Sequence, residues 1–311
     1  MLSTSDVFLT NYRQNALAKI GFSAEQLHER FPHLIICVIS GFGREGPDSS
    51  RPGYDLAAFW ARSGLAKSCT ATGYLPFTLS PGAGDHATAM AAAAGVCAAL
   101  IQKGKTGKGQ IVDTSLLSVG VYTNSWNTAS YLRFNRVPKQ PPRNSLPNPM
   151  LNCYMSKDKK GFWIVGLESE RHWPNTAKAL GLEKLLDDPR FSNASKRRTN
   201  SKVLISIFDD CFASLNFEEL AAKFEEHDVW YAPIQDVDEV TKDPQVIANG
   251  MIVNIPPNGD GPHLASVATP VRFNNSNTTP KGPVPKPGEH TKDILINLGL
   301  DPDKVEILAK L

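Results

Sequence analysis

Cysteine is scarce in this chain, and its spacing does not suggest disulfides. The 311 residues include five cysteines, none of which form a C-x-x-C pair: Cys37, Cys69, Cys97, Cys153 and Cys211. An odd, widely spaced set fits a reducing compartment better than a disulfide framework. Histidine and cysteine also never fall at the spacing of a zinc site. We therefore predict neither structural disulfides nor a bound metal.

The chain also lacks an excess of charge and a long apolar run. Lys and Arg number 33 and Asp and Glu number 31, so the formal net charge is +2. This balance gives no reason to expect nucleic acid or an anionic membrane as a partner. Residues 34–40 and 87–101, the most apolar stretches, are too short or too rich in alanine for a membrane span. With no secretory signal pattern at the N-terminus, we expect a soluble intracellular protein.

Two common catalytic motifs are missing. Residues 104–110 (GKTGKGQ) resemble a phosphate-binding loop, but no glycine stands five residues before Gly104, as G-x-x-x-x-G-K-[ST] requires. The G-x-S-x-G elbow of many hydrolases is also absent. Neither a P-loop nucleotidase nor a serine hydrolase of that type is therefore favoured.

The first part of the chain has the alternating pattern of an α/β domain. Residues 34–40 (LIICVIS) form a short apolar run rich in β-branched residues, which is typical of a strand buried on both faces in a parallel sheet. Residues 85–103 contain eight alanines between an aspartate and a lysine, and alanine is the best helix former. We also expect a strand and then a helix within 6–21, and a further strand at 111–113. Helices are expected at 24–31, where Ser23 is the N-cap, at 54–66 and at 115–134.

After residue 135 the pattern changes to a smaller α+β unit. Residues 136–149 are rich in proline and form an extended linker. The strands expected after it are 150–155, 162–167, 230–237, 251–256 and 267–273, and the helices are 174–180, 197–215, 217–226, 239–249, 291–298 and 302–311. We predict a large domain (1–135), the linker, a small α+β domain (150–260), and a return segment (261–311) that rejoins the large domain.

Asp85 is the candidate with two competing interpretations. It follows Gly82-Ala83-Gly84 and opens the alanine-rich helix, so on spacing alone it is a helix N-cap, the usual role of an aspartate there. The alternative is a nucleophile. Glycines let a ligand approach the backbone, the helix N-terminus favours negative charge, and a carboxylate can attack a thioester carbonyl.

Several motifs follow one another along the chain: FGREGP (42–47), RPGYD (51–55), SGL (63–65), Asp85, KTGKGQIVDTS (105–115) and GEHT (288–291). In this order they resemble the family III CoA-transferases, a group that includes formyl-CoA transferase, carnitine CoA-transferase and the α-methylacyl-CoA racemases. The resemblance covers nearly the whole chain. It implies a Rossmann-like large domain, a small α+β domain and an interlocked homodimer whose linkers pass through the partner's ring.

The resemblance also implies a reaction and a set of residues. Asp85 matches the nucleophile that carries CoA from an acyl-CoA donor to a small carboxylic acid through an anhydride and an aspartyl-CoA thioester. Acyl-CoA would be a substrate, and no permanent cofactor is expected. Asn11, Arg13 and Lys19 match CoA-binding positions, and Tyr54 a wall of that site.

Tyr54 also separates two branches of the family. The racemase branch has a histidine at this position for two-base proton transfer. A phenol titrates near pH 10 and is a poor base at neutral pH. Transferase is therefore favoured over 2-methylacyl-CoA racemase or epimerase. In the linker, Arg143 is a candidate for binding the acceptor carboxylate.

The chain departs from the family pattern at its start. The family begins with a glycine-bearing strand and a helix, and this sequence is expected to start after them, so an inactive CoA-binding homologue is a third possibility. The C-terminal Ala309-Lys310-Leu311 is close to the peroxisomal S-K-L address. A cytoplasmic or peroxisomal location is expected, with a mitochondrial one left open.

Overall fold

The computed structural model describes residues 1–257, 261–262 and 264–308, so the C-terminal tripeptide Ala309-Lys310-Leu311 lies outside the described residues. The chain divides into two compact units, Met1–Leu146 and Pro147–Leu311. The finer division expected from the sequence, with a linker and a return segment, stays a prediction. The two units are described separately below.

The first unit is built on a parallel sheet of three strands in the order β1-β2-β3. Strand β1 (Val7–Thr10) pairs with β2 (Ile35–Ser40), and β2 pairs with β3 (Ile111–Ser115). Residues 35–38 of the central strand are fully or almost fully buried, as a β-branched run covered on both faces should be. The parallel α/β arrangement expected from the sequence is confirmed.

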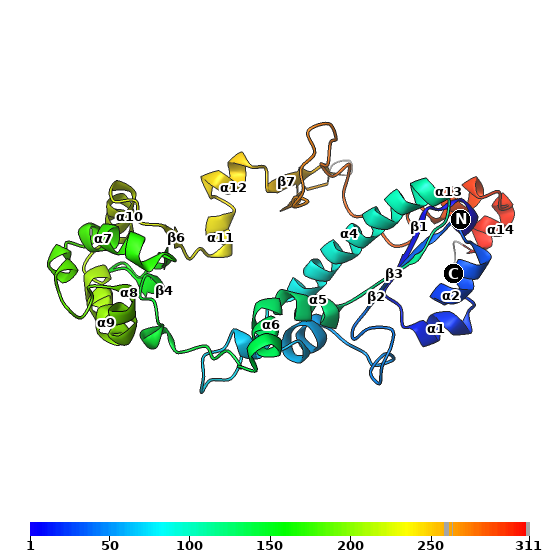
Figure 1. Cartoon of the computed structure of the whole chain (residues 1–311). Coiled ribbons are helices and arrows are strands. Elements are labelled where there is room, and N and C mark those ends of the chain that lie inside the picture. Colours follow the sequence, from blue (N-terminus) through cyan, green and yellow to red (C-terminus); the bar gives the residue numbers. More distant parts are fainter. Residues whose placement is uncertain (258–260, 263, 309–311) are drawn as a thin grey trace. The chain divides into compact units, whose positions relative to one another are not determined.

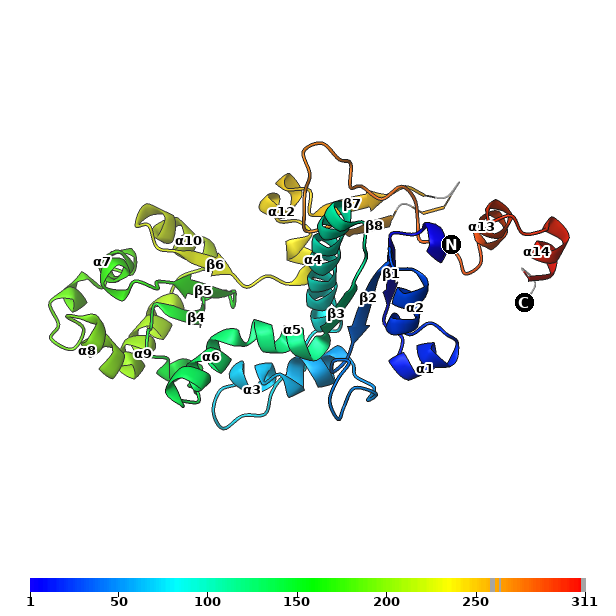
Figure 2. The same cartoon turned by 45° about the vertical axis from the view of Figure 1, so that its right-hand side comes forward.

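Helices cover both faces of this sheet (Figures 1 and 2). Helix α2 (Ala24–Arg30) packs against β2, and its N-terminus is closed by a capping box between Ser23 and Gln26, so the predicted cap is confirmed. Helix α4 (Ala83–Thr106) lies along the other face. At Gly95 a Cβ would come within 2.7 Å of the Val112 side chain. The helix therefore approaches β3 closely because a glycine faces it.

Helix α4 is longer than the segment predicted from the sequence. It runs for 24 residues and, within the described part of the chain, is the one helix long and apolar enough to cross a membrane by length and composition. Residues 87–101, which were expected to be too short or too rich in alanine for a membrane span, lie within this longer helix. Here α4 contacts β2, β3 and α5 (Leu116–Thr123), which is the packing of a covering helix in an α/β layer.

A π-helix, η2 (Leu56–Arg62), replaces most of the α-helix expected at 54–66 and is followed by α3 (Leu65–Ser68). Its buried residues Ala58, Phe59 and Trp60 form a core with Leu65 and Leu116. The remaining elements of this unit are η1 (Leu2–Thr4), α1 (Gln14–Lys19), α6 (Ser125–Phe134) and η3 (Arg143–Ser145).

The long helix expected over residues 115–134 is wrong as one element. It is interrupted at Asn124, between α5 and α6. The buried side chain of Asn124 donates a hydrogen bond to the carbonyl of Ser63 at 3.3 Å. This tertiary bond fixes Asn124 outside helical geometry, and no periodicity in the sequence signals it.

The second unit contains an antiparallel sheet in the order β4-β5-β6. Strands β4 (Leu151–Met155) and β5 (Gly161–Val165) form the predicted hairpin, and β6 (Tyr231–Pro233) pairs with β5. The helices of this part are α7 (Ser169–Ala179), η4 (Glu183–Leu186), α8 (Ala194–Thr199), α9 (Ser201–Phe212), α10 (Phe217–Glu226), α11 (Val237–Val240) and α12 (Pro244–Ala248).

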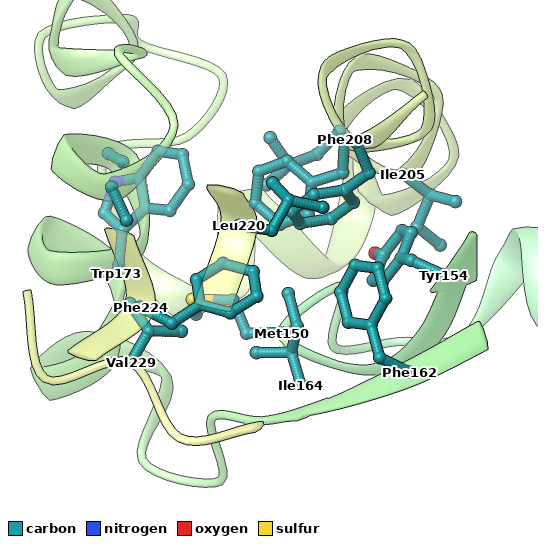
Figure 3. Close-up of a cluster of buried hydrophobic side chains, with 14 of the residues drawn as sticks. Met150, Tyr154, Phe162, Ile164, Trp173, Ile205, Phe208, Leu220, Phe224 and Val229 are labelled. Carbon is teal, nitrogen blue, oxygen red and sulfur yellow. The ribbon is translucent and has the colours of Figure 1, made fainter. Parts of the chain in front are cut away.

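Aromatic side chains fill the core between this sheet and its helices (Figure 3). Phe162 of β5 is fully buried and meets Phe212 of α9 edge to face at 5.1 Å between ring centroids. Phe224 of α10 lies against the same pair. Such aromatic contacts add to the stabilisation that comes from burial itself, so this unit has a core of its own.

The unit ends with β7 (Ile252–Ile255), β8 (Leu264–Val267), α13 (Thr291–Asn297) and α14 (Pro302–Leu308). The strand predicted at 267–273 is wrong beyond Val267. The ladder ends at the pair of Ile252 and Val267, beyond which the Ala268 N–H donates one more hydrogen bond to the Met251 carbonyl at 2.9 Å. Pro270 also lacks the N–H that an extended ladder would need.

Candidate active site

Asp85 lies in the first turn of α4 but does not cap it. The N-cap is Gly82, which has φ = +80°, and Asp85 is the third helical residue. The N-cap interpretation of Asp85 is therefore wrong. A left-handed Gly82 starts the helix without a side chain, which leaves the exposed Asp85 carboxylate in the positive field of the helix N-terminus.

Asp85 lines a cavity of about 710 Å³ in the first unit. The cavity lies where the carboxyl ends of β1 and β2 meet the start of α4, the edge at which open parallel α/β sheets bind ligands. Its lining is Leu9, Asn11, Tyr12, Arg13, Gln14, Ile39, Ser40, Gly41, Gly43, Ser49, Arg51, Pro52, Gly53, Tyr54, Asp85, Thr88 and Leu116. The wall thus combines apolar side chains, two arginines and one carboxylate.

Four of the six residues predicted for the site come together here. Asn11 and Arg13 precede α1, Tyr54 precedes η2, and Asp85 follows the start of α4. Tyr54 lines the cavity and is 83% exposed. Three segments distant in sequence therefore supply the predicted residues to one cavity.

Lys19 and Arg143 lie elsewhere. Lys19 is the last residue of α1, and Arg143 is the first residue of η3. Neither lines the cavity as the described residues form it. Their proposed contacts with CoA and with an acceptor acid stay predictions.

Arg51 is a lining residue that the sequence-based prediction did not single out. Its Nη1 lies 3.7 Å from Oδ1 of Asp48, whereas Nη1 of Arg62 lies only 2.9 Å from Oδ2 of the same aspartate. Asp48 is therefore paired more closely with Arg62. Because Arg51 is the first residue of the R-P-G-Y-D motif, the motif itself was the signal that could have identified it.

The glycine loop after β2 was noted as a motif in the sequence but was not predicted to line the site. Ser40, Gly41 and Gly43 line the cavity, and residues 41–46 (GFGREG) have the G-x-G-x-x-G spacing directly after a strand. A dinucleotide fingerprint would require a helix to start in this loop. The described chain instead continues through turns and bends to η2 at Leu56. Gly41 and Gly43 therefore line the cavity without forming a dinucleotide-binding motif.

The cysteine of the central strand, Cys37, is poorly placed to compete with Asp85 as a nucleophile. Cys37 is completely buried in β2, and burial, followed by the nearby Asp113 charge, raises the pKa of its thiol. A thiol whose pKa is raised is a weak nucleophile. Among the residues described, no group of three or more His, Cys, Asp or Glu side chains could hold a metal ion. The arrangement thus offers an exposed carboxylate at a helix N-terminus, with arginines nearby.

Comparison with known proteins gives consistent matches over the chain. The model of CoA-transferase family III matches residues 1–291. The chain is 31% identical over 305 residues to (R)-2-hydroxy-4-methylpentanoate CoA-transferase of Clostridioides difficile, covering 98% of this chain and 76% of that protein. It is 33% identical over 302 residues to human succinyl-CoA:glutarate CoA-transferase, covering 95% of this chain and 66% of that protein.

A solved structure agrees with these matches. The crystal structure of a CAIB/BAIF family protein from Brucella suis superposes with a TM-score of 0.81 at 27% sequence identity, over 96% of this chain and 76% of that one. The likeness therefore extends over both units and is one of fold as well as of sequence.

Proposed function

Because the chain belongs to CoA-transferase family III and is a CoA-transferase, we propose that it moves CoA from an acyl-CoA to a carboxylic acid through covalent intermediates on Asp85. The observation that carries this proposal is the placement of Asp85. It lines the cavity from the first turn of α4 without capping the helix. A capping role would have explained its position, and that role belongs to Gly82.

The proposed reaction has four steps at one carboxylate. The Asp85 carboxylate attacks the thioester carbonyl, the C–S bond breaks, and CoA leaves as a thiolate, forming a mixed anhydride. The thiolate then attacks the Asp85 carbonyl carbon and releases the donor acid, which leaves an aspartyl-CoA thioester. The acceptor carboxylate displaces the thiolate to form a second anhydride. Finally, the thiolate attacks the acceptor carbonyl, giving the new acyl-CoA and a free Asp85 carboxylate.

The groups around Asp85 suit the negative charge of the proposed oxyanions and of CoA, and the apolar character of an acyl chain. The unsatisfied N–H groups of the first helical turn can stabilise the oxyanions of each attack. Arg13 and Arg51 can pair with CoA phosphates or a substrate carboxylate, while Leu9, Ile39 and Leu116 offer apolar contacts to an acyl chain. The acids in the names of the two relatives, a branched hydroxy acid and a dicarboxylic acid, support a carboxylic acid acceptor.

We propose a homodimer as the working assembly of this Rossmann-like enzyme. The outer face of α4 carries apolar side chains in water: Met90 is 47% exposed and Ile101 is 65% exposed. An apolar surface of this kind on a long helix is typical of a protein interface. Light scattering during gel filtration would test the assembly, with about 68 kDa expected from two copies of the 33.9 kDa chain.

The covalent step can be tested by intact-protein mass measurement. The protein is mixed with succinyl-CoA or another acyl-CoA and quenched with hydroxylamine or borohydride, and the modified residue is located by peptide mapping. We expect a modification at Asp85 that disappears in Asp85→Asn. Asp6→Asn is the matched control, because Asp6 is an exposed aspartate bonded to Lys103 near the opposite end of α4.

Three results would contradict the proposal. An adduct that survives in Asp85→Asn would place the nucleophile elsewhere. Binding of CoA without any adduct would indicate an inactive CoA-binding homologue. Exchange of the α-proton of a 2-methylacyl-CoA in deuterated buffer would instead indicate a racemase. Tyr54 would then occupy the position at which the racemase branch has its histidine base.

A further inference from the structure

One carboxylate from a neighbouring element holds the start of the helix that carries Asp85. Asp55 is the N-cap of the π-helix η2, and its Oδ1 accepts a hydrogen bond from the N–H of Leu56 at 2.6 Å. Its Oδ2 accepts a second hydrogen bond from the N–H of Gly82 at 2.9 Å. Asp55 therefore links two helix starts that are 27 residues apart in sequence.

The bond to Gly82 acts at a sensitive point of α4. Gly82 is the N-cap, so its N–H lies outside the intrahelical ladder and needs a partner from elsewhere. Asp85 follows three residues later in the first turn. Any rotation of Gly82 about its backbone changes the direction in which this turn presents the Asp85 carboxylate to the cavity.

The same two elements also meet through direct packing. A Cβ on Gly84 would lie 2.8 Å from Cβ of Asp55 and 2.7 Å from Cβ of Phe59. The backbone of α4 is thus pressed against the first turn of η2 on the side from which Asp55 reaches Gly82. π-helical turns are rare and concentrate at functional sites, and here the π-helix supplies both the packing surface and the hydrogen-bond acceptor.

From this geometry we infer that Asp55 is a positioning residue for the transfer reaction. It acts on Asp85 through the N–H of Gly82, and it does so without being the nucleophile. The inference rests on the proposed function of Asp85. It predicts that loss of the Gly82 bond slows the chemistry while leaving the arginines and other CoA contacts of the cavity in place.

Asp55→Asn separates positioning from simple capping of η2. The amide has a single acceptor oxygen, which we expect to stay with the adjacent Leu56 N–H, so that the cap remains and the Gly82 bond is lost. Asp55→Ala removes both bonds. If Asp55 only caps η2, Asn behaves like wild type; if it positions Asp85, Asn behaves like Ala. Asp243→Asn is the matched control, because Asp243 accepts from two backbone N–H groups at the start of α12.

We expect kcat of Asp55→Asn to fall by about tenfold to a hundredfold, since a small misplacement of a reacting group has effects of that size. The KM for acyl-CoA should change less than about threefold, because uniform binding is untouched. Without any substrate, hydrogen exchange at the Gly82 amide should be at least about tenfold faster than in wild type. Asp243→Asn should change none of these values.

The outcomes separate this inference from the proposed function. Unchanged Gly82 exchange in Asp55→Asn, or faster exchange with wild-type kcat, overturns the positioning role. A rise in KM at constant kcat also overturns it, because that pattern belongs to a binding residue. The absence of any Asp85 adduct in the wild-type protein refutes the proposed function instead, and the exchange measurement is independent of that result.

Discussion

Replacing Gly84 by alanine should push the first turn of α4 away from η2, against which it packs. A Cβ at this position would lie 2.7 Å from Cβ and Cγ of Phe59 and 2.8 Å from Cβ of Asp55. Carbon atoms in ordinary contact are about 3.5–4.0 Å apart, so the added methyl group overlaps its neighbours by roughly 0.7–1.3 Å. The two backbones must separate by about this amount.

Two opposing terms set the effect of Gly84→Ala on stability. Overpacking typically costs about 1–3 kcal/mol, whereas alanine is favoured over glycine inside a helix by about 1 kcal/mol. The net loss is therefore about 0–2 kcal/mol, a modest change in melting temperature. The effect on catalysis should be larger, because a displacement of about 1 Å can slow an enzyme about a hundredfold.

Gly104→Ala is the control for this prediction. Gly104 belongs to the same helix, and nothing lies within 4 Å of the Cβ that it would gain. It therefore gains the helix propensity without the overlap, and we expect it to raise the melting temperature and keep full transferase activity. Differential scanning fluorimetry and initial rates on both variants test the reasoning. If Gly84→Ala matches Gly104→Ala in both measurements, the close packing of α4 on η2 does not position Asp85.

Three further predictions concern the rest of the molecule. Phe162→Ala should destabilise the second unit by about 3–5 kcal/mol, measured by urea unfolding, because its ring is fully buried among aromatic partners. The Ala194 N–H, and then Arg197, hold the pKa of Glu170 below its ordinary value of 4.5. The stabilising contribution of Glu170 should therefore be present above pH 4.5 and disappear as the pH falls below it. The melting temperatures of wild type and Glu170→Gln should accordingly converge well below pH 4.5. Iodoacetamide should leave buried Cys37 unmodified in the native protein, whatever else reacts, and modify it only after unfolding.

Much of the fold could be predicted because local patterns and tertiary structure agree. The composition of β2 is that of a strand buried on both faces, and the composition of α4 is that of a helix. The break at Asn124 could not be predicted, because it depends on a hydrogen bond to Ser63, sixty-one residues earlier. The π-helix at Leu56 was also beyond local propensity, since the composition of this segment indicates a helix but does not distinguish i→i+5 from i→i+4 hydrogen bonding.

The candidate site was predicted best where ordered motifs fix it. Asn11, Arg13, Tyr54 and Asp85 all reach one cavity. The sequence did not reveal the start of α4, because an aspartate after a glycine is the usual sign of a cap. The helix is instead capped by a left-handed Gly82, whose N–H donates a hydrogen bond to Asp55 in another element. That partner is invisible to any local pattern.

The placement of Asp85 therefore depends more on small residues and backbone bonds than on side chains that touch it. Gly82 supplies the left-handed turn, and Gly84 permits contact of α4 with η2. Gly120 permits contact of α5 with the same π-helix, where a Cβ would lie 2.5 Å from the carbonyl oxygen of Phe59. Gly84 and Gly120 thus permit close approach of the neighbouring backbones, and Asp55 accepts a hydrogen bond from the Gly82 N–H. If Asp85 is the nucleophile that we propose, an orientation set by the backbone below it lets it change its covalent state repeatedly without losing a side-chain partner.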